Sequence, residues 1–319
     1  MLRTIIFNGT STKLIDNQSR VKLPGPGELC WIDVQQYQAE ELHAVGDAMG
    51  FHQLAIADCQ HEIERAKLDD YEKYLFIVMH SMSMSVNGRR GVHSTALDSF
   101  LGENYLVTVH SEPLPAIDAL IKRAATDLTC CARGADYLFY LIVDALVDEA
   151  FPIVDKLSDQ IEEVESAILR RSEPSQLAQL MRLKRLLISM RRVLSPERDV
   201  LAMMIRRGDP RVQDRTAIYF RDVYDHVVRA YEQIDVERDL LGNAMDAYMS
   251  MNANRSNVIM KQLTLLASIF LPLTFLTGFF GQNFSALPFD SRSLFYIEIA
   301  ACVALPVTMV YWFRRSGWW

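Results

Sequence analysis

Two long apolar runs stand close together near the C-terminal end of the sequence. Residues 262–280 (QLTLLASIFLPLTFLTGFF) contain no charged side chain, and residues 294–313 (LFYIEIAACVALPVTMVYWF) contain one, Glu298. A helix needs about 20 mainly apolar residues to cross the hydrocarbon of a bilayer. Helices buried in a soluble domain would normally show a polar face, which the first run lacks. The two runs therefore predict two transmembrane helices joined by a loop at residues 281–293.

Basic residues flank these runs on their outer sides, namely Arg255, Lys261, Arg314 and Arg315. The connecting loop holds only Arg292 against Asp290. By the positive-inside rule, both chain termini are then cytoplasmic and the loop lies outside. Glu298 stands about one turn into the second run, so two interpretations stay open: its carboxylate reaches the outer interface, or it has a role inside the membrane.

Composition excludes several classes of protein. The net charge of −7 argues against a general nucleic-acid binder and favours attraction of cations. Mean hydropathy is +0.04, too low for a transporter with many spans. The five cysteines form no C-x-x-C pair, which indicates reduced thiols. The sequence has no phosphate-binding G-x-x-x-x-G-K-[ST] loop, no complete H-E-x-x-H motif and no nucleophile elbow, so we do not expect an enzyme.

The first 130 residues predict a cytosolic α/β domain. GELCWIDV, KYLFIVMHSMSM and TALDSFLGENYLVTVHSE have the apolar and β-branched character of strands. QQYQAEELHAVGDAMG and PLPAIDALIKRAA have the pattern of helices. The Asn-Gly of VNGRRG, between two strand candidates, predicts a hairpin turn.

Residues 131–215 predict an antiparallel helical hairpin. DYLFYLIVDALVDEAFPIVDKLSDQIEEVESAILRR reads as one long helix that ends before Pro174, and the segment up to the GDP at 208–210 reads as its return arm. The first arm is acidic between residues 144 and 166, and the second is basic between 170 and 192. Either the two arms pair through these charges, or the acidic arm attracts cations by itself.

A third helix begins near Thr216 and meets no proline before Pro272. Its cytosolic part, residues 216–261, forms a stalk that continues into the first span at 262–280. Up to Phe280 such a helix would be roughly 100 Å long at 1.5 Å per residue. A lone helix of this length is not stable in isolation and needs partners.

Steps of three and four residues along this helix give one row of small, polar and thin apolar side chains. The row, here called the small-polar row, contains Asp246, Ala253, Asn257, Met260, Thr264, Ala267, Leu271, Thr274 and Gly278. Steps that average 3.5 keep one face toward identical copies in a parallel bundle. Small residues also allow transmembrane helices to pack closely, so the row predicts either a pore lining or a packing surface, or both.

Amide and hydroxyl oxygens suit a strongly hydrated cation. Mg²⁺ loses its water reluctantly, so a site for it often contacts the water shell and not the bare ion. Rings of Asn or Thr oxygens accept hydrogen bonds from that shell. The neighbouring amides of FFGQNF, behind Gly281, indicate that the loop after the first span is also built to hold something by hydrogen bonds.

Over nearly its full length the chain resembles the CorA family of divalent-cation channels. The resemblance is carried by YFRDVYDHVVRAYEQID, by NRSNVIMKQLTLLASIFLPLTFLTGFFGQNF and by the tail YWFRRSGWW. It implies an α+β membrane protein of the inner cell membrane: a homopentameric funnel with a cytosolic α/β domain, a long stalk helix, two C-terminal spans and a basic cytosolic tail at 314–319. Metal cations and membrane lipid would be its partners, besides its own copies.

The resemblance also implies roles for single residues. Gly281, Gln282 and Asn283 would form the ion-entry loop, where the family usually has Gly-Met-Asn. Asp246, Asn257 and Thr274 match pore-lining positions. Asp222 matches a cytosolic carboxylate that binds regulatory Mg²⁺ between subunits. No partner acid is found: the SMSMSVNGRRG loop offers only Asn87, and Asp69 and Asp70 belong to another element.

Three functions stay open. The first is Mg²⁺ influx through a channel that closes when cytosolic Mg²⁺ binds at Asp222. The second, favoured by Gln282 in place of methionine, is proton-coupled transport of Zn²⁺, or of Co²⁺ or Ni²⁺, as in the related ZntB branch. The third is a membrane-anchored assembly that no longer conducts, because the loop has Asp290 as its only acid.

Overall fold

The computed structural model describes residues 1–16, 23–25, 27–61, 65–84, 91–206, 209–282 and 291–318. The chain divides into two compact units. The first is Met1–Ala167 with Glu173–Met245, and the second is Ile168–Ser172 with Asp246–Trp319. Apart from Gly91, the hairpin turn predicted at VNGRRG lies outside the described residues.

Seven described strands of the first unit form one sheet in the order β2-β1-β3-β7-β6-β5-β4. β3 and β7 are parallel, and the other neighbouring pairs are antiparallel. The strands are β1 Leu2–Phe7, β2 Thr12–Asp16, β3 Leu29–Gln35, β4 Lys67–Asp70, β5 Leu75–Met84, β6 Val92–Leu101 and β7 Tyr105–His110. The predicted strands correspond to β3, β5, β6 and β7, while β1, β2 and β4 were not predicted.

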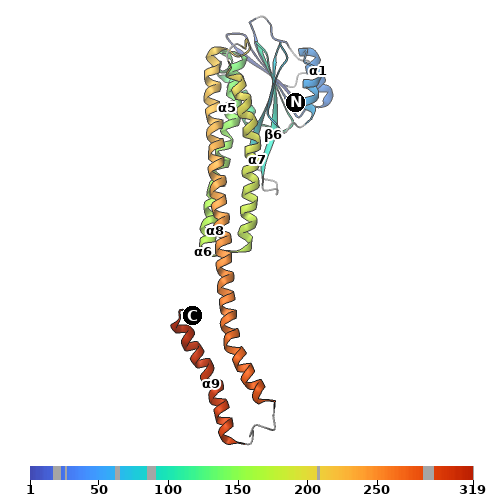
Figure 1. Cartoon of the computed structure of the whole chain (residues 1–319). Helices are drawn as coiled ribbons and strands as arrows, with labels where there is room; N and C mark the ends of the chain where they lie inside the picture. The colour runs from blue at the N-terminus through green and yellow to red at the C-terminus, as the bar shows by residue number, and fades with distance from the viewer. Residues whose placement is uncertain are drawn as a thin grey trace. The chain divides into compact units, whose positions relative to one another are not determined.

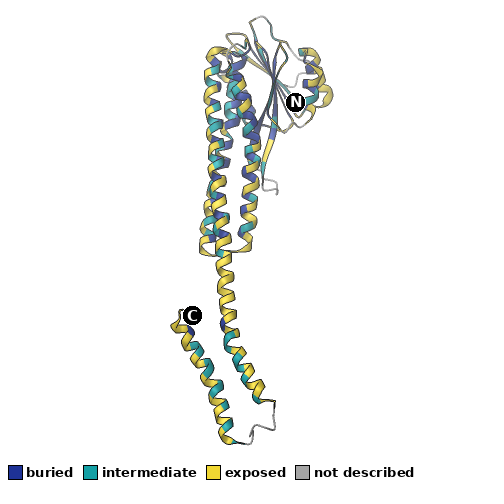
Figure 2. Cartoon of the chain, in the orientation of Figure 1, coloured by how far each residue is buried: buried dark blue, intermediate teal, exposed yellow. Residues whose placement is uncertain are grey.

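Helices cover both faces of this sheet, because successive residues of a strand point to opposite sides. On one face, Ile32, Phe100 and Val107 share a core with α1 (Ala39–Met49) and α2 (Gln53–Gln60). The other face is covered by α3 (Pro115–Thr126) and α5 (Ala135–Asp148), with the short α4 (Thr129–Ala132) between them in sequence. Figure 1 shows α1 and α5 on opposite sides of the sheet, and Figure 2 shows buried residues both in the strands and on the packed faces of the helices.

The helical segment after α5 differs from the single long helix that the sequence predicts. The structure has two helices, α5 and α6 (Ala150–Arg170), with a break at Glu149. Pro152 explains the break: proline has no N–H to donate to the carbonyl four residues earlier, and its ring clashes with that carbonyl. After Ser172 the chain returns as α7 (Pro174–Met204).

The break places Glu149 beside a stretch of the sheet edge that no described strand covers. β4 pairs with residues 75–78 of β5, so in the described part of the chain Met79–Met84 has no strand partner on that side. Glu197 of α7 accepts a hydrogen bond from the His80 backbone N–H at 2.9 Å. Glu149 accepts one from the Met82 backbone N–H and one from the Ser81 hydroxyl. Two glutamate carboxyl groups thus take the place of a neighbouring strand, because buried backbone donors need partners.

Glu197 makes the stability of the first unit depend on pH. Its carboxyl is fully buried, and burial raises its pKa to about 8, although the bond from the His80 N–H opposes the rise. The folded state therefore holds a proton that the unfolded chain releases above about pH 4.5. Glu197 stabilises the fold below that pH, and the contribution is lost as pH rises toward 8.

We expect Glu197→Gln to reduce this loss, because glutamine keeps an acceptor oxygen for His80 without a proton to lose. Thermal unfolding of the wild type and of Glu197→Gln between pH 5 and 9 measures how the stability of each protein changes with pH. The matched control is Asp199→Asn, because Asp199 is an exposed acid of the same helix that pairs with Arg198. A wild-type and a Glu197→Gln protein with the same pH dependence would contradict the assignment.

The second unit contains the end of α8 (Asp214–Phe280) and all of α9 (Arg292–Arg315). Each helix has an 18-residue window of high mean hydropathy, 2.0 in α8 and 1.9 in α9. Only 6% of the first window and 0% of the second is buried inside the chain. A core helix of a soluble protein would be mostly buried. Both helices are thus long and apolar enough to cross a membrane, and their apolar surface is left uncovered by this chain.

Candidate functional site: the exposed face of helix α8

Within the first unit, one row of α8 residues is buried against the chain's own helices. The row advances by steps of three and four and contains Thr216, Phe220, Val223, Val227, Ala230, Ile234, Glu237, Leu241 and Ala244. This spacing is typical of packing between nearly parallel or antiparallel helices. Polar contacts flank it: Gln233 bonds Asp155 of α6 at 3.2 Å, and Arg191 of α7 pairs with Asp235 at 2.8 Å. α6 and α7 therefore hold α8 by one defined face.

The small-polar row lies elsewhere on the same helix. Every one of its positions is exposed: Asp246, Ala253, Asn257, Met260, Thr264, Ala267, Leu271, Thr274 and Gly278. At 100° per residue, Asp246 points about 200° around the helix from the buried Ala244. The described part of the chain thus leaves the row accessible to lipid, water or other copies.

The hydroxyl groups of the row are arranged as acceptors. Thr264 Oγ1 donates to the Met260 carbonyl at 2.9 Å, and Thr274 Oγ1 donates to the Phe270 carbonyl at 2.9 Å. A hydroxyl that donates to its own helix keeps its lone pairs for other donors. The water shell of a cation is such a donor.

The helix ends tightly at the entry-loop sequence. The Gly281 N–H donates to the Thr277 carbonyl at 3.0 Å, and the Gln282 N–H donates to the Phe279 carbonyl at 3.3 Å. A Cβ at Gly281 would stand 3.1 Å from the Thr277 carbonyl oxygen, so glycine fits this end better than a larger residue. At Gly278 a Cβ would meet nothing within 4 Å. Asn283 lies outside the described residues.

Asp222 lies near two acids of α5 that sequence reasoning did not connect with it. Burial raises the pKa of the Asp144 carboxyl, and the charges of Asp148 and Asp222 raise it further against the opposing effect of His226. His226 Nδ1 lies 3.6 Å from Asp148 Oδ1. The only sequence signal was the spacing of Asp144 and Asp148, four residues apart and therefore on one helix face.

No group of three or more His, Cys, Asp or Glu side chains in the described part of the chain is arranged to hold a metal ion. The described acids near Asp222 do not by themselves form such a group.

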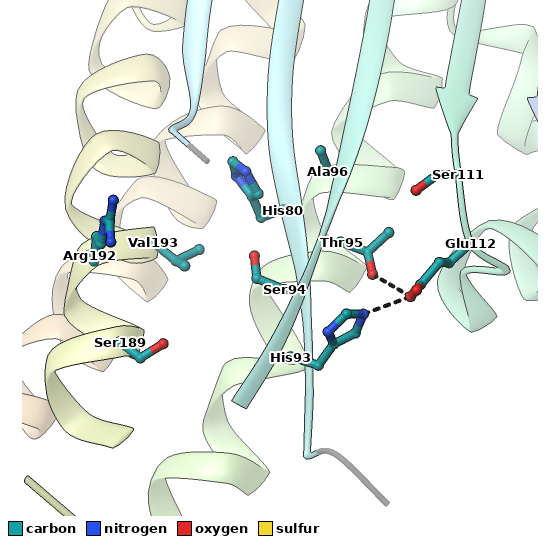
Figure 3. A pocket seen from close by; sticks show the side chains of 10 residues that line it. All are labelled: His80, His93, Ser94, Thr95, Ala96, Ser111, Glu112, Ser189, Arg192 and Val193. Atoms are coloured by element: carbon teal, nitrogen blue, oxygen red, sulfur yellow. Dashed lines mark hydrogen bonds and ion pairs between the residues drawn. The ribbon is translucent and has the colours of Figure 1, made fainter. Parts of the chain in front are cut away.

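A polar cavity of about 340 Å³ lies apart from α8, between β6 and α7. Figure 3 shows His93 and Thr95 of β6 directed at Glu112, with Arg192 and Val193 on the helix across from them. Glu112 accepts from His93 at 2.7 Å and from Thr95 at 3.0 Å, and these bonds lower the pKa of its carboxyl. Both bonds reach the same oxygen, Oε2. The residues that line this cavity belong neither to the small-polar row nor to the acids near Asp222, so the cavity is not part of the candidate site.

An α/β domain, one helix that continues into an apolar segment, a second apolar helix and an exposed row of acceptor oxygens define a membrane protein of the ion-transporting class. The chain matches the family model of CorA-like Mg²⁺ transporter proteins over residues 26–315, and it belongs to that family. It is therefore a CorA-like divalent-cation transporter, and its family is one of transporters and not of enzymes.

Three relatives illustrate the match. The cobalt/magnesium transport protein CorA of Thermotoga maritima is 31% identical over 291 residues, which cover 90% of this chain and 83% of that protein. The zinc transport protein ZntB of Pectobacterium atrosepticum is 28% identical, with 76% of this chain and 73% of that protein covered. The complete structure of the CorA magnesium transporter of Methanocaldococcus jannaschii has a TM-score of 0.86 and 26% identity, covering 100% of this chain and 99% of that one. This likeness confirms the fold class predicted for a single chain: an N-terminal α/β domain, a long helix and two apolar C-terminal helices.

Proposed function

We propose that five copies of this chain surround a pore lined by the small-polar row and admit Mg²⁺ to the cytoplasm. The α/β domain (1–130), the hairpin (131–215) and the stalk (216–261) lie in the cytosol. Residues 262–280 and 294–313 span the inner cell membrane, the loop 281–293 lies outside, and the tail 314–319 lies inside. The names of the Thermotoga and Methanocaldococcus relatives, which include magnesium, support this choice of ion.

The observation that carries the proposal is the exposure of the whole small-polar row. Asn257 and Asp246 are polar groups that the described part of the chain neither pairs nor covers. Beside Asp246 another face of α8 is packed through Ala244 and Tyr248, whereas residues 252–264 are exposed on every face. Lipid offers no hydrogen bonds to polar groups that enter the hydrocarbon. Facing copies and a water-filled pore satisfy them, and small residues such as Ala253 and Ala267 let the copies approach.

Each part of the row has a chemical role in this arrangement. Gln282 and Asn283 amides receive the hydrated ion at the entry loop, behind Gly281. Thr274, Thr264 and Asn257 accept hydrogen bonds from its water shell, and Asp246 attracts it at the cytoplasmic end. Leu271, Met260 and Gly278 set the width, and an apolar ring can close a pore by excluding water.

Purified protein in liposomes tests this function. We expect Mg²⁺ uptake that needs no proton gradient and rises with an inside-negative potential, because each charge gains about 2.3 kcal/mol per 100 mV. Protein-free liposomes and liposomes held at zero potential are the controls. Uptake that ignores the potential argues against a channel, and absence of any cation uptake identifies a non-conducting assembly.

The same liposomes test a second function, proton-coupled transport of Zn²⁺, Co²⁺ or Ni²⁺. It is supported by Gln282, where the family usually has methionine, and by the zinc transport relative. It requires Zn²⁺ uptake that depends on an imposed pH gradient. Zn²⁺ uptake unaffected by the gradient removes it.

A further inference from the structure

The end of α9 turns back through a defined helix-terminating motif. Gly317 has φ +71, in the region that favours glycine. Its N–H donates to the Arg314 carbonyl at 3.4 Å, and the Trp318 N–H donates to the Phe313 carbonyl at 3.0 Å. These two bonds make a Schellman motif, and the rings of Phe313 and Trp318, 6.2 Å apart, supply the apolar contact that accompanies it. The motif fixes the direction of Trp318.

Trp318 thereby closes a groove against α8 within the second unit. The groove has a volume of about 500 Å³ and is lined mainly by apolar side chains, among them Val258, Leu265, Leu266 and Ile269. Lys261 is the charged residue of its lining, and its ammonium group donates to the Gly317 carbonyl at 3.4 Å. Figure 1 shows the end of α9 returning beside α8. The result is an aliphatic groove with one cation and one indole.

The charges around this groove have one sign. Residues 250–269 of α8 contain Arg255 and Lys261, residues 299–318 contain Arg314 and Arg315, and neither segment has an acid. Basic side chains and tryptophans concentrate where a span meets the cytoplasmic interface. A phospholipid has the complementary form, with an acyl chain for the aliphatic wall and a phosphate for the ammonium group. The uniformly positive surroundings favour a headgroup with net negative charge.

We propose that this groove binds one anionic phospholipid. The acyl chain packs on Leu265, Leu266 and Ile269, Trp318 covers it near the glycerol, and Lys261 binds the phosphate. The site rests on the membrane position of α8 and α9 and not on which ion the protein carries, so it stands or falls independently of the proposed function.

Quenching of tryptophan fluorescence by brominated lipid tests the site. The test uses a full-length variant with Trp312→Phe and Trp319→Phe, so that Trp31 and Trp318 are its remaining tryptophans. Trp31 is buried in the sheet, with 1% of its surface exposed, and Trp318 therefore reports on the groove. Nanodiscs of phosphatidylcholine contain a small fraction of brominated phosphatidylglycerol or, for comparison, brominated phosphatidylcholine. We expect half-maximal quenching at about fivefold less phosphatidylglycerol than phosphatidylcholine, the factor that corresponds to about 1 kcal/mol for one lysine at a membrane surface.

Lys261→Gln removes the expected preference, whereas Arg292→Gln, at the far end of α9, preserves it. Leu266→Phe, which fills the groove without changing charge, weakens quenching by both lipids and serves if Lys261→Gln does not fold. Equal quenching by both lipids overturns the proposal, as does a preference that survives Lys261→Gln. Absence of quenching by either lipid overturns it too, because no lipid then lies beside Trp318.

Discussion

Replacing Asn257 by leucine is expected to slow cation uptake about tenfold or more while leaving the assembly intact. In the proposed pore this change converts a ring of amide oxygens into an apolar ring, which offers the hydrated ion no acceptor and favours loss of water from the pore. Each unsatisfied hydrogen bond costs about 1–3 kcal/mol, so the rate falls about tenfold or more. Flux into liposomes at fixed membrane potential measures it.

Asn252→Leu is the matched control. Asn252 is also exposed on α8 and undergoes the same change in chemistry, but it lies five residues away, about 140° around the helix. We expect its flux to stay close to that of the wild type. If Asn252→Leu stops uptake and Asn257→Leu does not, a different face of α8 lines the pore. Size-exclusion chromatography of both variants shows whether the assembly is preserved.

Replacing Asp222 by alanine is expected to leave uptake running at cytosolic Mg²⁺ concentrations that silence the wild type. Asp222 is exposed, and its charge adds to those of Asp144 and Asp148. The family resemblance implies that Mg²⁺ binds at Asp222 between subunits. We propose that the bound ion relieves this repulsion and holds the closed state. Loss of the Asp222 carboxylate should raise the cytosolic Mg²⁺ concentration needed for inhibition about tenfold. This factor is within the usual range of coupling between two sites.

Flux measured against a series of internal Mg²⁺ concentrations gives that shift. Asp239→Ala is the control, because Asp239 is an exposed acid of the same helix, 74% accessible, outside the Asp222 cluster. Unchanged inhibition in Asp222→Ala would remove the regulatory role. An equal shift in Asp239→Ala would reduce it to an effect of overall charge.

The fold class follows from sequence because its signals are long. Apolar runs of membrane length, and a row of residues repeated over about thirty positions of α8, do not depend on distant contacts. The short edge strands do. β2 (TKLID) and β4 (KLDD) carry charged residues and become strands because β1 and β5 offer them backbone partners. Composition alone gives such segments no strand signal.

The candidate site divides in the same way. The small-polar row could be read from spacing, and the structure leaves it exposed. The acids near Asp222 could not be predicted from spacing, because Asp144 and Asp148 come from α5, some seventy residues earlier in the chain. The break between α5 and α6 was missed since periodicity continues across it, although Pro152 marks it. The roles of Gln282 and Asn283 rest on resemblance.

The carboxyl groups of Glu149 and Glu197 have a consequence for how copies of the chain can meet. An uncovered strand edge is a template on which a strand of another molecule can pair. Along Met79–Met84 the outward N–H groups of His80 and Met82 are already bonded to these side chains. A foreign strand would have to displace two acids before it gained its first hydrogen bonds. At this edge the chain is closed to addition by another sheet, and contacts between copies there are left to helices.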